Sequence, residues 1–85
     1  MASFEYTIKD ELGIHARPAG LLVKAAKASG ATVSIEKGGK KVDASKLMAV
    51  MSLGVKKGET VTVTCEGGNE NQAASDMKAF FEENL

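Results

Sequence analysis

The stretch TVTVTCE, residues 60–66, carries the clearest structural signal in this sequence. Apolar and polar side chains alternate along it and β-branched residues dominate, which predicts a β-strand with one buried face. We expect its apolar side chains to face the core: Val61, Val63 and Cys65. The threonines between them then face the opposite side, and the rest of the chain has to cover the apolar face.

Downstream of this strand, the alternation gives way to a helical pattern. Asn69 is followed three residues later by Gln72, a capping-box signature that predicts the start of a helix. Apolar residues then form one stripe to the end of the chain: Ala73, Met77, Phe80 and Phe81. We therefore expect the chain to close on a helix.

The segment upstream of the strand predicts a short helix, because apolar residues recur there at helical spacing: Leu47, Val50 and Met51. Ser45 or a neighbour is placed to cap this helix, and Gly54 follows its end. Before it, Val33 and Ile35 alternate with polar residues. The segment Lys37-Gly38-Gly39-Lys40 then predicts a tight turn into a short strand around residue 42.

The N-terminal region predicts a strand followed by a helix. Apolar residues share one face of an alternating segment over residues 3–8: Phe4, Tyr6 and Ile8. Residues 10–13 break the alternation. A helix with Pro18 near its start then runs to about Ser29, and Gly30 ends it.

The predicted order is βαββαβα, in a single domain that spans residues 1–85. We assign it to the α+β class, with four strands in one sheet and the helices covering its apolar face. Eighty-five residues suffice for one hydrophobic core. No linker, low-complexity tract or convincing repeat divides the chain.

Composition argues against several functions. Eleven lysines and arginines balance eleven aspartates and glutamates, and only 5% of residues are aromatic, so a nucleic-acid-binding domain is disfavoured. The lone cysteine permits no intramolecular disulfide, and one histidine gives little basis for a metal site. The N-terminus lacks an apolar stretch typical of a signal peptide or membrane helix. We expect a cytoplasmic protein without membrane insertion.

The only histidine lies in GIHARPA, residues 13–19, directly before the first predicted helix. The first turn of a helix has unpaired backbone N–H groups and the positive end of the helix dipole, which together bind phosphate. Arg17 adds a fixed positive charge, and Pro18 loses no hydrogen bond there. Because a neutral imidazole nitrogen is a nucleophile, His15 is predicted to carry a phosphoryl group.

A solvent-exposed loop histidine beside an ordinary helix start is the alternative explanation of His15 alone. No second histidine and no glycine-rich nucleotide loop accompanies it, so the sequence offers no means of binding ATP or activating water. Phosphoryl transfer would then need a partner protein and no cofactor, and the chain would be a carrier rather than an enzyme. Cys65, on the inward face of its strand, is interpreted as structural.

The segments GIHARPAG, residues 13–20, and SLGVKKG, residues 52–58, together with the element order, resemble the histidine-containing phosphocarrier family HPr along essentially the whole chain. The resemblance implies an open-faced β-sandwich, an antiparallel four-stranded sheet with three helices on one side. It implies that enzyme I, charged by phosphoenolpyruvate, phosphorylates Nδ1 of His15. Sugar-specific phosphotransferase components then receive the group for sugar uptake. Arg17 matches the phosphate-facing arginine, and Ala16 and Pro18 complete the helix start.

The resemblance also implies a partner-binding surface on the first two helices: Gly20, Leu21, Lys24, Lys27, Leu47, Met48 and Met51. Flexible methionines suit a surface that accepts several partners, although a short helix can also bury them. The lysines can steer acidic partners or simply belong to a solvated face.

The serine region departs from the family pattern. Many Gram-positive members carry a regulatory serine at the start of the second helix, within Lys-Ser-(Ile or Leu)-Met. This chain reads Ala44-Ser45-Lys46-Leu47-Met48, so Lys46 occupies the serine position and Ser45 lies one residue early. One residue is about 100° of rotation on a helix, so Ser45 is not a safe substitute. We expect modification by HPr kinase to be weak or absent.

A regulatory protein-binding module of the same fold, which docks on a partner without carrying phosphate, is the alternative function. The presence of His15 and the altered serine region both disfavour it. We expect the protein to act as a monomer.

Overall fold

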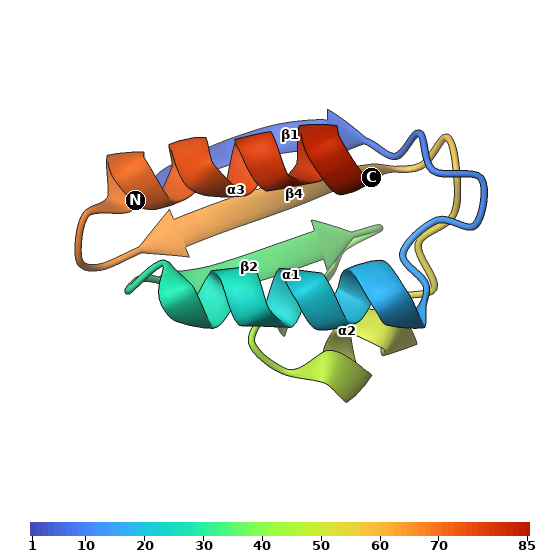
Figure 1. The fold of residues 1–85 in the computed structure, drawn as a ribbon, viewed down its shortest axis with the longest axis horizontal. Coiled ribbons are helices and arrows are strands. Elements are labelled where there is room, and N and C mark those ends of the chain that lie inside the picture. Colours follow the sequence, from blue (N-terminus) through green and yellow to red (C-terminus); the bar gives the residue numbers. More distant parts are fainter.

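The computed structural model describes residues 1–85 and has the predicted order of strands and helices (Figure 1). The elements are β1 (Ala2–Thr7), α1 (Ala16–Ala28), β2 (Thr32–Lys37), β3 (Lys40–Asp43), α2 (Leu47–Ser52), β4 (Thr60–Glu66) and α3 (Glu70–Asn84). Each element lies where its local pattern predicts it, within one or two residues at its ends.

The strands form one antiparallel sheet in the order β1-β4-β2-β3. The strand β4 lies inside the sheet, where Val63 has Phe4 of β1 on one side and Ile35 of β2 on the other. Val61, Val63 and Cys65 are at most 1% exposed, as predicted. The alternation of β4 is so clear because both of its edges are paired and one whole face is buried.

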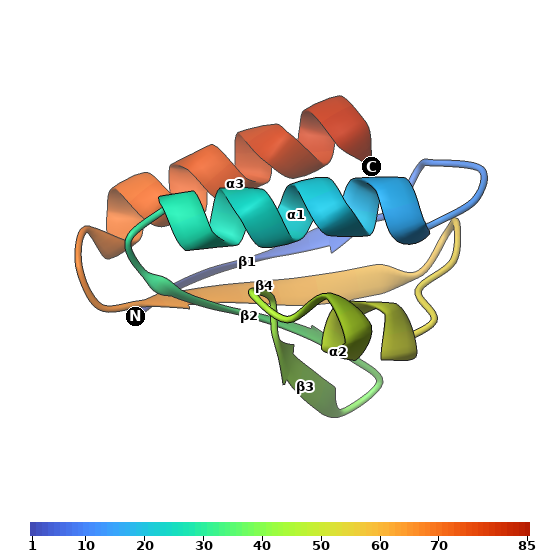
Figure 2. The ribbon, with the colours of Figure 1, turned by 60° about the horizontal axis from the view of Figure 1, so that its bottom comes forward.

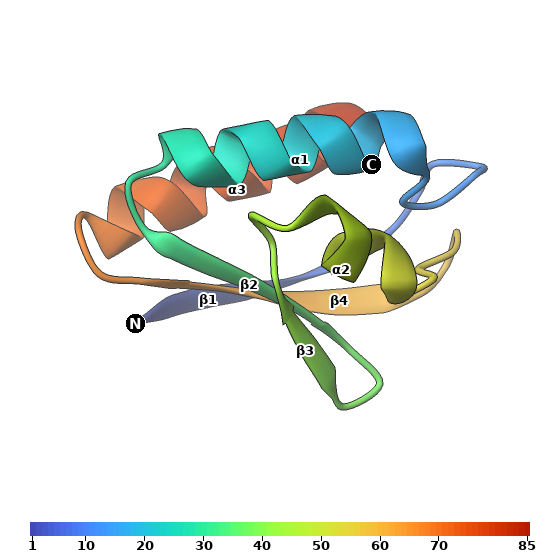
Figure 3. The same cartoon turned by 90° about the horizontal axis from the view of Figure 1, so that it is seen from below.

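All three helices cover the same face of the sheet, which makes the molecule an open-faced sandwich (Figure 2). The helices α1 and α3 lie side by side, and α2 lies below the N-terminal half of α1 (Figure 3). The apolar stripe of α3 faces the core, where the Phe81 ring packs edge-on against Phe4, Tyr6 and Phe80. None of the helices has the length and apolar character that crossing a membrane requires.

The end of β2, next to the turn into β3, is bonded to the residues that follow α2. Gly38 and Gly39 have φ of +58° and +84°, a pair of left-handed conformations that favours glycine and suits a tight hairpin. The adjacent Lys37 Nζ donates to the carbonyls of Leu53 and Gly54, at 3.3 and 3.1 Å. This side chain therefore ties the end of the six-residue helix α2 to the sheet.

The capping-box prediction for α3 is half confirmed. Asn69 is the N-cap residue, and its Oδ1 accepts a hydrogen bond from the Gln72 N–H at 3.2 Å. The Gln72 side chain donates to Asp76 Oδ1 at 2.8 Å instead of returning to the cap. The second hydrogen bond of a capping box, from the Asn69 N–H to the Gln72 side chain, is therefore missing, and Gln72 bonds Asp76 one turn further along the helix.

Candidate functional site

His15 is the N-cap residue of α1, where the loop after β1 becomes helical. Its backbone is extended, with φ −95° and ψ −174°, and its carbonyl accepts a hydrogen bond from the Ala19 N–H at 2.9 Å. The side chain makes no cap bond, and 37% of it is exposed. The histidine singled out by the sequence therefore lies at a helix start with an accessible ring.

The loop before His15 packs against the segment that follows α2. The Ile14 N–H donates to the Val55 carbonyl at 3.0 Å. Gly13 has φ +67°, and a Cβ at this position would meet the Val55 carbonyl oxygen and lie 2.7 Å from Lys56 Cα. Only glycine permits this close approach. The backbone contacts of the loop therefore position His15 without using its side chain.

The first turn of α1 presents positive groups that the protein does not neutralise. The N–H groups of Ala16 and Arg17 have no hydrogen-bond partner in the chain, and no acidic residue lies in this turn. Arg17 is exposed and pairs with no carboxylate. Unpaired donors, the positive end of the helix dipole and a guanidinium together form an anion-binding arrangement.

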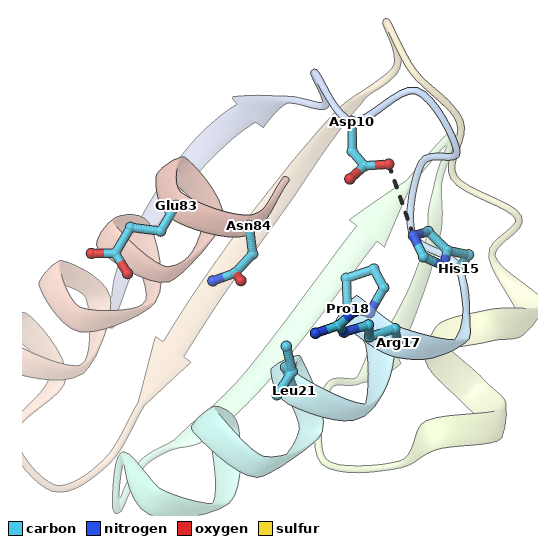
Figure 4. A pocket seen from close by; sticks show the side chains of 7 residues that line it. All are labelled: Asp10, His15, Arg17, Pro18, Leu21, Glu83 and Asn84. Carbon is cyan, nitrogen blue, oxygen red and sulfur yellow. Dashed lines mark ion pairs between the residues drawn. The ribbon is translucent and has the colours of Figure 1, made fainter.

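A hollow of about 330 Å³ lies over this turn (Figure 4). Seven residues line it: Asp10, His15, Arg17, Pro18, Leu21, Glu83 and Asn84. Sites for organic ligands are usually closed and apolar, whereas this hollow is open and mostly polar. It therefore offers polar contacts to a ligand rather than an enclosed apolar pocket.

Three of the lining residues lie outside the sequence prediction. Glu83 and Asn84 come from the last turn of α3, and nothing in their local pattern indicates that α3 ends beside the start of α1. Asp10 does carry a signal, because it is an acidic residue at the start of the loop that leads to His15. Its Oδ1 lies 3.9 Å from His15 Nε2 (Figure 4).

The residues predicted to bind partners are accessible: Gly20, Leu21, Lys24 and Lys27 on α1, and Leu47, Met48 and Met51 on α2. Met48 and Met51 are 78% and 38% exposed, because α2 directs Val50 into the core instead. Of these residues, Leu21 lines the hollow, whereas α2 packs against α1 and contributes no residue to it. The role of these residues in binding stays a prediction.

The prediction that Ser45 or a neighbour caps α2 is wrong. The N-cap position is held by Lys46, and no side chain bonds the start of this helix. The Ser45 hydroxyl and N–H both donate to Asp43 Oδ1, at 2.7 and 2.8 Å, because the turn directs Ser45 back toward β3. These two bonds lower the pKa of the Asp43 carboxyl.

Cys65 is buried in β4, and burial raises the pKa of its thiol. A buried thiol with a raised pKa is a poor nucleophile, which agrees with a structural role. No three side chains of the His, Cys, Asp or Glu type gather as they would around a metal ion.

Fold and site together define a small α+β domain with one accessible histidine at the start of its first helix. The sequence model of the family described as the PTS HPr component phosphorylation site matches residues 2–83. The chain therefore belongs to the PTS-HPr family, and the resemblance drawn from its sequence is confirmed. This membership supports a phosphocarrier role in the phosphotransferase system.

Solved structures agree with this assignment. HPr-C-His from Thermoanaerobacter tengcongensis matches with a TM-score of 0.92 and 37% identity, over 98% of this chain and 93% of that one. The histidine-containing phosphocarrier protein of Mycoplasma matches with a TM-score of 0.91 and 30% identity, over 96% and 93%. Crh from Bacillus subtilis, a catabolite repression protein described as a dimer with a swapped domain, matches with a TM-score of 0.78 and 35% identity, over 100% and 98%. The predicted open-faced sandwich is confirmed.

Proposed function

We propose that this protein is a phosphoryl carrier of the sugar phosphotransferase system and that His15 is the acceptor and donor. The observation that carries the proposal is an accessible imidazole and an unpaired Arg17 that line one hollow at a helix start with free N–H groups (Figure 4). Family membership supports it. Residues 1–85 act as a single domain in this proposal.

The transfer exchanges one bond to phosphorus for another. The lone pair of His15 Nδ1 attacks the phosphorus of a phosphorylated donor, and the donor keeps the electron pair of the bond that breaks. The N–H groups of Ala16 and Arg17 donate to the phosphoryl oxygens, and the Arg17 guanidinium faces them. In this proposal no side chain activates water, and the adduct persists until a second protein takes the group. The chain is a carrier rather than an enzyme.

Enzyme I, charged by phosphoenolpyruvate, is the proposed donor, and sugar-specific components are the proposed acceptors. Both have to reach His15, so they bind in turn to the surface around it. Leu21 on α1 and Met48 on α2, the helix packed against α1, offer exposed apolar area, while Lys24 and Lys27 attract acidic residues. One copy of the chain contains all seven residues of the hollow, so we propose that the protein acts as a monomer. We also propose that it acts in the cytoplasm.

The test is transfer of labelled phosphate from phosphoenolpyruvate through enzyme I. Wild-type protein is expected to form one acid-labile and alkali-stable adduct, and His15→Ala is expected to form none. Lys78→Ala, an exposed substitution on α3 outside the hollow, is the matched control and should be labelled like wild type. Absence of labelling in folded wild-type protein with an active enzyme I would refute the proposal.

A regulatory binding module is the second candidate, and the similarity to Crh favours it. Such a module would bind its partner without accepting phosphate, so the labelling test separates the two functions. For serine modification, we propose that HPr kinase acts weakly or not at all, because the Ser45 hydroxyl is bonded to Asp43 and Lys46 occupies the family's serine position.

Mass spectrometry after incubation with HPr kinase and ATP tests the serine proposal. We expect little or no phosphate on wild-type protein. A double variant that exchanges the two residues, Ser45→Lys with Lys46→Ser, restores the family order and is expected to be modified. Stoichiometric phosphorylation of Ser45 in the wild type would contradict the proposal.

A further inference from the structure

Asp10 closes the loop that carries His15. Its Oδ1 accepts a hydrogen bond from the Leu12 N–H at 2.9 Å, and its carbonyl accepts one from the Gly13 N–H at 3.0 Å. Its own N–H donates to the main-chain oxygen of Leu85 at 2.9 Å, which ties the loop to the end of α3. The carboxylate therefore has a defined position, although 32% of the side chain is exposed.

This carboxylate faces one particular nitrogen of the imidazole. Asp10 Oδ1 lies 3.9 Å from His15 Nε2, which is too long for a hydrogen bond but within the range of an electrostatic contact. Two other charged residues line the hollow: Arg17 lies beside His15 on α1, and Glu83 extends from α3 away from it (Figure 4). Asp10 is the carboxylate that pairs with the ring.

We propose that Asp10 is a positioning residue for His15, which keeps the hydrogen of the neutral ring on Nε2 and the lone pair on Nδ1. The proposal rests on the proposed function of His15 as a phosphoryl acceptor. A neutral imidazole has one N–H nitrogen and one nitrogen with a lone pair, and the partner of either nitrogen selects the tautomer. Because a carboxylate only accepts, the nitrogen that faces Asp10 carries the hydrogen.

In the same position, the Asp10 carboxylate also stabilises the positive charge that develops on the ring during transfer. Nδ1 forms its bond to phosphorus as the donor's bond breaks, the electron pair leaves with the donor, and the Nε2 hydrogen stays in place. The ring then carries positive charge, which the Asp10 carboxylate stabilises. A contact that is long in the free protein can shorten as this charge develops. In this proposal Arg17 stabilises the charge on the phosphoryl oxygens, and Asp10 stabilises the charge on the ring.

Asp10→Asn separates charge from geometry, since the amide oxygen can still accept the Leu12 N–H. Two-bond ¹H–¹⁵N NMR of the unphosphorylated protein, at a pH where the ring is neutral, reports the tautomer without any partner protein. We expect Nε2–H in the wild type and a mixture of tautomers in Asp10→Asn. Glu11→Gln is the matched control. It removes a neighbouring carboxylate that pairs with Lys57 at 2.6 Å, and it should leave the tautomer unchanged.

Phosphorylation by enzyme I supplies the second measurement. We expect Asp10→Asn to lower kcat about fivefold with an unchanged KM, because the lost attraction acts across a partly solvated contact. Glu11→Gln should change neither constant. An Nδ1–H tautomer in the wild type, or equal tautomer populations in wild type and Asp10→Asn, overturns the proposal whatever the rates. A wild type with Nε2–H that accepts no phosphate refutes the proposed function instead.

Discussion

The helices α1 and α3 start with the same kind of unpaired backbone N–H groups, but only α3 satisfies one of them with a side chain of its own. At α3, Asn69 accepts a hydrogen bond from the Gln72 N–H, and Glu70 places a carboxylate in the first turn. At α1, the side chain of His15 makes no cap bond, and the first turn has no acidic residue. An uncapped helix start is less stable by about 1 kcal/mol. The difference therefore favours an external anion as the partner of the α1 start.

The two starts also differ in what positions them. The helix α3 begins at its own cap, whereas α1 is held by a loop that packs Gly13 against Val55 and Lys56. External support leaves the His15 side chain available for chemistry. We therefore expect substitutions near the start of α1 to change the stability of the protein and its phosphoryl transfer independently of each other. Substitutions at the α3 cap should change stability alone.

Removing the external support of α1 has the largest expected effect. In Gly13→Ala, the new Cβ lies 2.7 Å from Lys56 Cα and the residue has φ +67°, so the loop has to move. We expect the free energy of unfolding in urea to fall by about 3 kcal/mol. Gly30→Ala is the control, because φ there is +74° with no atom within 4 Å of a Cβ, and it should lose about 1 kcal/mol. Equal losses would show that the close approach adds nothing.

Giving α1 the acidic first turn of α3 tests the comparison directly. Ala16 is exposed, so Ala16→Glu places a carboxylate beside the free N–H groups. We expect stability to rise by about 0.5 kcal/mol through the helix dipole. Phosphoryl transfer to His15 should fall about 30-fold, or roughly 2 kcal/mol, because the carboxylate repels the incoming group. Ala16→Gln adds similar bulk without charge. If Ala16→Glu and Ala16→Gln transfer equally well, the helix start is not the phosphate cradle.

The elements of this fold are predictable from sequence because local periodicity specifies each of them. Both β4 and α3 bury one face. Apolar residues therefore recur at every second position in the strand and at every third or fourth position in the helix. The hydrogen-bond partner of the Ser45 hydroxyl was not predictable. The hydroxyl can bond either the helix or Asp43, and the geometry of the turn, which no periodicity encodes, decides between them.

The candidate site is predictable only as far as it is local. His15, Arg17 and Pro18 belong to one helix start, so a single motif identifies them. Glu83 and Asn84 reach the hollow through the packing of α3 beside α1, which brings together residues almost seventy positions apart. Only the tertiary structure specifies such a contact.

Removing the cap of α3 should have a moderate effect. Asn69→Ala deletes the acceptor of the Gln72 N–H, and we expect the free energy of unfolding to fall by about 1 kcal/mol. Phosphoryl transfer should stay at the wild-type level, because this cap is not part of the hollow. Asn71→Ala makes the same change inside the helix, where alanine is favourable, and should not destabilise. A large loss of transfer in Asn69→Ala would mean that the two helix starts are coupled.

The start of α2 extends the comparison to the third helix and has the smallest expected effect. The side-chain and backbone hydrogen bonds of Ser45 lower the pKa of Asp43 below its ordinary value of 3.8. A carboxyl with a lower pKa in the folded state contributes stability that is complete above its ordinary pKa. That contribution is lost as the pH falls through the lowered one. Asp43→Asn should therefore be less stable than wild type at neutral pH and approach it in acid.

Urea unfolding of both proteins across this acidic range measures the effect on α2. Ser45→Ala removes the first of the two bonds and keeps the second, so its stability should depend on pH less steeply than that of the wild type. A difference between wild type and Asp43→Asn that stays constant with pH would assign the contribution to packing. Such a result would mean that the start of α2 is stabilised neither by the charge of Asp43 nor by an external anion.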